Sequence, residues 1–139
     1  MKMKITLGED YYYTPNPSHR DNNPNKSQWD CSIKEKQECV ICEKSVNNGW
    51  FTKNNNYYRS WGLNIDSNGK PQEIGHAQDG ERLKVALFVE NQKIWHGYPA
   101  NLKNKQDTPL YRILIEWRNK GYINKSRMKK LKRHQECTI

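Results

Sequence analysis

Residues 83–90 (LKVALFVE) are the most strand-like segment of the sequence. Val85, Leu87 and Val89 alternate with other side chains, so they are expected on one face of a β-strand. The Asn-Gln pair that follows predicts a turn into a second strand over residues 93–98 (KIWHGY). This part of the chain therefore predicts an antiparallel hairpin.

An earlier segment carries the same kind of signal. Residues 57–65 (YYRSWGLNI) alternate large apolar and polar side chains, as a half-buried strand does. An Asn-rich turn at residues 54–56 precedes the segment, and the Asn-Gly pair at residues 68–69 is a strong hairpin signal. We therefore expect a small antiparallel sheet of two hairpins over residues 50–100.

The pattern becomes helical over residues 107–135. A Thr-Pro pair at residues 108–109 is typical of a helix start, and the apolar residues that follow recur at helical spacing. These residues are Leu110, Ile113, Leu114 and Trp117. Gly121 is expected to end this helix, and Asn124 to cap a second, basic helix over residues 125–134. The sequence thus predicts a C-terminal helical hairpin.

The composition fits one domain over residues 1–139 that is poor in apolar residues. The apolar share is 34%, below the usual ~45–50% of globular proteins. A membrane span is excluded, because no window approaches roughly 18 consecutive apolar residues. Five Trp and eight Tyr argue against a disordered chain. No secretory signal is visible at the N-terminus, so we expect a cytoplasmic protein.

Residues 1–30 are expected to form a loop-rich, extended arm. Residues 11–25 (YYYTPNPSHRDNNPN) contain three Pro and four Asn without apolar periodicity. The Tyr run at residues 11–13 is too aromatic for a linker, so we expect it to pack on the body of the domain. The fold class is therefore α+β: an antiparallel sheet followed by two helices, with an N-terminal arm.

The net charge of +9 is concentrated at the C-terminal end of the chain. Residues 118–139 hold eight basic residues against one acid, whereas the first 117 residues are nearly neutral. The basic residues are Arg118, Lys120, Lys125, Arg127, Lys129, Lys130, Lys132 and Arg133. A dense basic block attracts polyanions and releases their counterions. We expect these residues to bind nucleic acid or another polyanion.

Cys39 and Cys42 form a Cys-x-x-Cys pair, the spacing of a zinc knuckle. The sequence predicts such a knuckle over residues 31–49, pinning the N-terminal region. Cys31 and His76 are the best further ligands for a structural zinc, ahead of His96 and His19. Ordinary reduced thiols and a redox pair are the alternatives. A Cys-x-x-Cys turn is similar to that of HNH-type nucleases, but the Asp-His or His-His pair of that family is absent, and the chain is assigned to no family.

Two histidines are candidates for catalysis. His96 lies at a strand end, and with Tyr98, Arg82 and Arg112 it would make a metal-independent ribonuclease site. His76 would serve a nuclease supported by zinc. Neither belongs to a complete catalytic motif, so no catalytic residue is assigned and the enzyme class stays open.

The function favoured by the sequence is a small basic nucleic-acid-binding module. Sixteen Asn and many Lys are typical of an AT-rich genome, which fits a bacterial or phage accessory protein. The first alternative is a small nucleic-acid-cleaving enzyme, and the second is a protein-interaction module that docks on an acidic partner.

Overall fold

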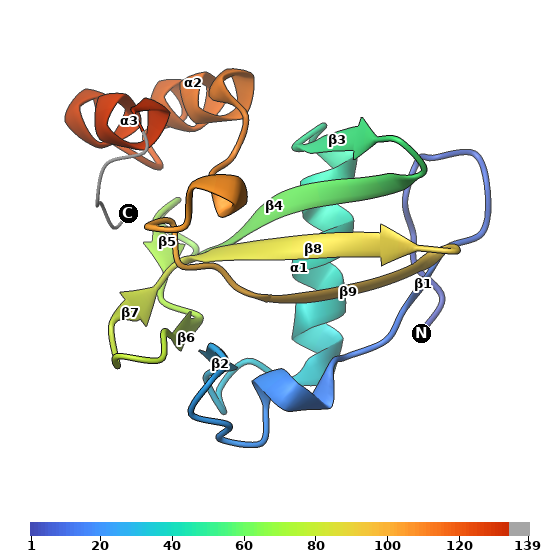
Figure 1. Ribbon diagram of the computed structural model, residues 1–139. Coiled ribbons are helices and arrows are strands. Elements are labelled where there is room, and N and C mark those ends of the chain that lie inside the picture. Colours follow the sequence, from blue (N-terminus) through green and yellow to red (C-terminus); the bar gives the residue numbers. More distant parts are fainter. Residues whose placement is uncertain (134–139) are drawn as a thin grey trace.

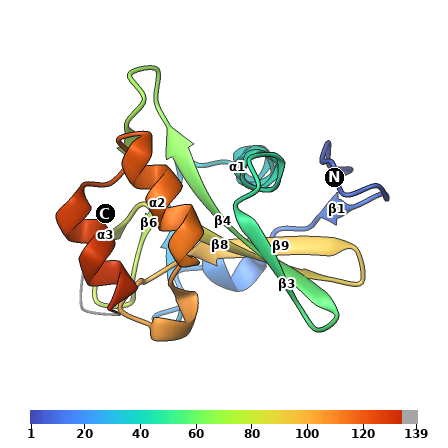
Figure 2. The ribbon, with the colours of Figure 1, turned by 90° about the horizontal axis from the view of Figure 1, so that it is seen from above.

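The main sheet lies between helices on both of its faces (Figures 1 and 2). The structure, a computed structural model, describes residues 1–133. Helix α1 (Glu35–Asn47) packs on one face, and helices α2 (Tyr111–Asn119) and α3 (Lys125–Lys132) cover the other. The predicted α+β class is confirmed. No helix within the described residues is long and apolar enough to cross a membrane.

The main sheet is mixed and larger than the sequence predicted. Its strands in spatial order are β1 (Tyr12–Tyr13), β9 (Ile94–Pro99), β8 (Val85–Asn91), β4 (Tyr57–Ile65) and β3 (Phe51–Asn54). The β3–β4 and β8–β9 hairpins are antiparallel, as predicted, and β1 adds a parallel strand beside β9. The short β5 (Pro71–Gln72) pairs antiparallel with the end of β4. A separate three-stranded sheet consists of β2 (Gln28–Trp29), β6 (Gly75–His76) and β7 (Arg82–Leu83).

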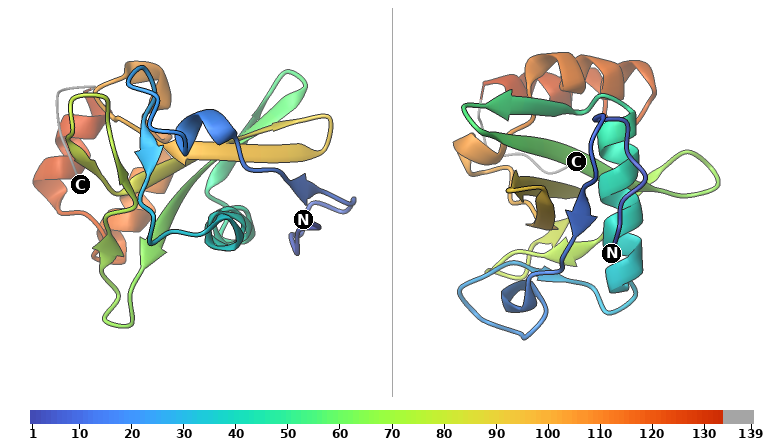
Figure 3. Two further views of the ribbon diagram at one scale, coloured as in Figure 1. Left: turned by 90° about the horizontal axis from the view of Figure 1, so that it is seen from below. Right: turned by 90° about the vertical axis from the view of Figure 1, so that its right-hand side faces the viewer.

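The N-terminal arm is packed against the body along much of its length (right panel of Figure 3). It contains β1, the 3-10 turn η1 (Pro17–His19) and β2. Tyr13 is fully buried and Tyr11 is nearly so, as expected for this Tyr run, while Tyr12 is 44% exposed. The prediction of an extended arm was therefore too simple, because its aromatic side chains supply part of the core beside α1.

Strand β8 is buried on both faces, whereas the sequence predicted apolar contacts on one. Val85 and Leu87 pack in the core beneath α2 and α3. Ala86 and Phe88 pack in the core beneath α1. This two-sided burial accounts for the nearly continuous apolar run of the segment, because a fully buried strand has no solvent-facing positions.

The contact between Phe88 and Gly97 determines how closely β8 and β9 approach. The two residues are register partners. A Cβ atom added at Gly97 would lie 2.2 Å from the Phe88 ring and 2.9 Å from the Leu87 carbonyl oxygen. Only glycine fits there without displacement of the ring.

The C-terminal helices confirm the predicted helical hairpin, apart from its first turn. Residues 105–107 form a 3-10 turn, and α2 begins at Tyr111 rather than directly at the Thr-Pro pair. Gly121 follows α2 with a φ of 80°. The Asn124 side chain accepts a hydrogen bond from the Arg127 amide at 2.8 Å and caps α3. Residues 134 and 135, predicted to continue this hairpin, lie outside the described part of the chain.

The Gly97→Ala substitution is expected to destabilise the protein by about 3 kcal/mol, at the upper end of the range for overpacking. The cost should fall in a Phe88→Leu background, because the shorter side chain yields to the new methyl group. Urea unfolding of the two single variants and the double variant measures this coupling. Additive effects would contradict the proposed ring contact.

Candidate functional site

The basic residues predicted to bind polyanions come together on α2, α3 and their connection, a surface that we call the basic hairpin. Seven of the eight side chains are exposed and Arg127 is half-buried. The two apolar residues of α3, Met128 and Leu131, point into the core, as the sequence predicted. None of the seven exposed residues forms an ion pair within residues 1–133.

A cleft of about 440 Å³ opens beside the start of α3. Lys70, Lys84 and Arg127 line it together with Pro71 and residues 121–124, and within residues 1–133 no acidic side chain lines it. Lys70 follows the turn between β4 and β5, in which its amide donates to Asp66 Oδ1 at 2.9 Å. Three cations from separate segments thus converge beside the basic hairpin. We call this hollow the basic cleft.

Lys70 and Lys84 were missing from the predicted site. They are isolated cations in strand regions of the sequence, with no local charge cluster to mark them. Lys70 directly precedes β5, and Lys84 lies between β7 and β8. Both lie near Arg127 only because α3 packs beside these segments in the folded protein.

Exposed aromatic surface lies beside these cations. The Lys132 ammonium is 4.4 Å from the ring centroid of Tyr111, and the Tyr111 residue is 43% exposed. The Lys120 ammonium lies 6.0 Å from the ring centroid of Trp50, but that ring is buried in the core and offers no stacking surface. A cation next to an exposed ring suits a ligand that carries both negative charge and flat bases.

The predicted zinc knuckle does not form. Cys39 and Cys42 lie within α1, on the helix face that packs against the sheet. Local spacing suggested a turn, but the apolar residues around the pair, including Ile41 and Val46, form the buried face of a helix. Burial raises the pKa of Cys39 to about 11 and raises that of Cys42 as well. Both side chains are therefore thiols at neutral pH.

The four proposed zinc ligands are not assembled within residues 1–133. Cys31 is exposed before α1, and His76 lies on β6 opposite Gln28 and Arg82. The described residues contain no group of three His, Cys, Asp or Glu side chains that would hold a metal ion. Zinc binding stays a prediction without a ligand set in this part of the chain.

His96 lies on β9 and is half-buried, and burial lowers its pKa. Its predicted arginine partners are engaged elsewhere. Arg82 pairs with Asp30 and Glu73, and Arg112 donates to the carbonyl oxygens of Gly49 and Phe51. Within residues 1–133 no contact between His96 and either arginine is found, so their grouping stays a prediction.

Tyr98 shares the face of β9 with His96, because side chains two residues apart point the same way along a strand. The ring that stacks on Tyr98 is that of His19, from the N-terminal arm.

No family model matches the chain, and no curated protein or solved structure matches it. The function is therefore argued from the residues themselves.

In the native protein at neutral pH, Cys31 is expected to react with iodoacetamide much faster than Cys39 and Cys42, because it is the exposed one of these three. Trypsin separates the two groups, since Lys34 and Lys44 end the respective peptides, and mass spectrometry then gives each rate. In urea the rates should converge. Equal rates in the native protein would contradict the burial of Cys39 and Cys42 in α1.

Proposed function

We propose that the protein binds nucleic acid through the basic hairpin and the basic cleft. The observation that carries the proposal is the convergence of Lys70, Lys84 and Arg127 on one cleft, next to the exposed cations of α3. Phosphate contacts of this kind supply most of the affinity in sequence-independent binding.

Nucleic acid fits this surface better than an acidic protein does. Phosphates recur at short, regular intervals along a strand, so one strand can reach both the cleft and the cations of α3. Tyr111 beside Lys132 offers a ring on which a base can stack.

The test compares two double variants with the same change in charge. Lys129→Gln with Lys130→Gln removes two cations from α3, whereas Lys34→Gln with Lys36→Gln removes two exposed cations at the start of α1. Fluorescence anisotropy with a short labelled single-stranded RNA or DNA measures affinity from about 50 mM to about 200 mM salt.

The α3 variant should bind more weakly, and its salt dependence should be shallower, because fewer phosphates are neutralised. On a single strand the log–log slope should fall by about 0.7 for each phosphate that the variant leaves unneutralised. The α1 variant should bind like the unmodified protein. Lys84→Gln should weaken binding in the same direction as the α3 variant. Equal affinities for both double variants, or binding that does not change with salt, would refute the proposal.

A further inference from the structure

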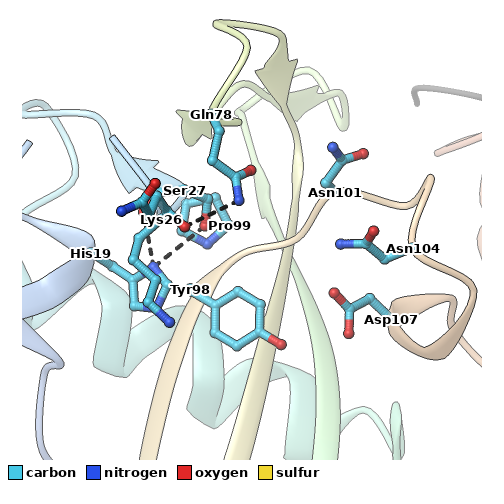
Figure 4. Close-up of a pocket in the computed structure, with 10 residues that line it drawn as sticks. His19, Lys26, Ser27, Gln78, Tyr98, Pro99, Asn101, Asn104 and Asp107 are labelled. Atoms are coloured by element: carbon cyan, nitrogen blue, oxygen red, sulfur yellow. Dashed lines mark hydrogen bonds between the residues drawn. The ribbon is translucent and has the colours of Figure 1, made fainter. Parts of the chain in front are cut away.

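A second, smaller pocket opens between the N-terminal arm and the loop after β9 (Figure 4). Its volume is about 280 Å³, just below the usual range of roughly 300–1,000 Å³ for ligand sites. His19, Lys26 and Tyr98 stand on one side, and Asn101, Asn104 and Asp107 on the other. None of the residues that line it, as far as the chain is described, belongs to α2 or α3.

His19 is held in one orientation and one tautomer. Its ring stacks on Tyr98 with the centroids 4.9 Å apart and the planes 15° from parallel. Its Nδ1 atom lies 2.8 Å from the Ser27 carbonyl oxygen. A carbonyl oxygen only accepts hydrogen bonds, so Nδ1 carries the proton and Nε2 keeps a lone pair. A neutral imidazole fixed in this way is suited to act as a base.

The surroundings of His19 favour its neutral form. Burial is the main cause that lowers the pKa of His19, and Lys26 and His96 add to the effect, while Ser27 and Asp21 oppose it. The Lys26 side chain lies beside the imidazole in the pocket (Figure 4). An anionic group bound there would contact an ammonium and a neutral base together.

The opposite side of the pocket is rich in hydrogen-bond acceptors. The Asp107 carboxyl faces the Tyr98 hydroxyl across the pocket (Figure 4), and its Oδ1 lies 3.9 Å from Arg59 Nη2. Asn101 and Asn104 add side-chain amides at the same rim. Such a wall suits the hydroxyl groups of a sugar, so the two sides together match a phosphate joined to a ribose.

We infer that this pocket binds one ribonucleotide unit of a single-stranded RNA and that His19 is the general base for cleavage of its phosphodiester bond. The pocket is too small for a duplex. It lies outside the basic hairpin and the basic cleft, and it therefore adds an activity to the proposed binding function.

The chemical step is an internal transfer of the phosphoryl group. Nε2 of His19 takes the proton of the 2′-hydroxyl, the 2′ oxygen forms a bond to phosphorus, and the bond from phosphorus to the 5′ oxygen breaks. The 5′ oxygen takes a proton from water, and the imidazolium returns its proton to solvent. The products are a 2′,3′-cyclic phosphate and a 5′-hydroxyl. The Lys26 ammonium stabilises the negative charge that builds up on the phosphate oxygens.

The test uses the full chain with a labelled single-stranded RNA and its 2′-deoxy counterpart. The unmodified protein should cleave the RNA to a 2′,3′-cyclic phosphate and leave the 2′-deoxy strand intact. His19→Ala should lower the rate at least about 100-fold, the usual contribution of a general base. Gln37→Ala is the control, because it removes a half-buried polar side chain of α1 outside the pocket, and it should cleave normally.

A second variant covers the case in which His19→Ala fails to fold, since His19 is buried. Lys26→Gln changes an exposed side chain and should fold normally. It should raise KM for RNA, because the ammonium that contacts the phosphate is lost. It should also move the midpoint of the pH–rate profile to higher pH, because Lys26 lowers the pKa of His19. In the unmodified protein the rate should rise with pH to a plateau, with its midpoint below the ordinary imidazole value of 6.5.

Three results would overturn the inference: no RNA cleavage by the unmodified protein, cleavage of the 2′-deoxy strand, or unchanged cleavage by a folded His19→Ala or by Lys26→Gln. Loss of cleavage with intact RNA binding would support the pocket independently of the basic hairpin. The binding measurement on the α3 variant is separate. Its result supports or refutes the proposed binding function and does not test the role of His19.

Discussion

Burial of β8 on both faces is the constraint on which the rest of the structure depends. Ala86 and Phe88 complete the core beneath α1, and Val85 and Leu87 complete the core beneath α2 and α3. The two cores share one strand, so neither helical layer can shift without affecting the other. The tight contact of Phe88 with Gly97 extends this constraint to β9 and thereby fixes Tyr98.

Both candidate sites depend on this layered arrangement. Docking of α2 and α3 on the sheet brings Arg127 to Lys70 and Lys84. The small pocket depends in addition on the N-terminal arm, which is anchored at the buried carboxylate of Glu38. That carboxylate accepts hydrogen bonds from the Tyr13 hydroxyl at 2.6 Å and from Arg20 Nε at 2.5 Å. Arg20 directly follows η1, so this anchor also positions His19.

Local signals predicted the hairpins and the C-terminal helices well, because turn and cap residues act over a few positions. Gly121 and Asn124 are examples. The helix α1 was missed because the Cys-x-x-Cys spacing was interpreted as a metal-binding turn. The same spacing also fits two buried thiols on one face of a helix, and the structure has that arrangement. The stacking of His19 on Tyr98 and the meeting of Lys84 with Arg127 arise only from long-range packing, which no local pattern encodes.

The most direct test is an NMR titration of the isotope-labelled protein with a short single-stranded RNA, under conditions where cleavage is slow. Amide shift changes are expected at residues 70, 84 and 118–133 as RNA is added, with a second group of changes at residues 19–27 and 98–107. Changes confined to α1 and the first ten residues, or no changes at all, would contradict the claim that the basic hairpin and the small pocket are the nucleic-acid contacts.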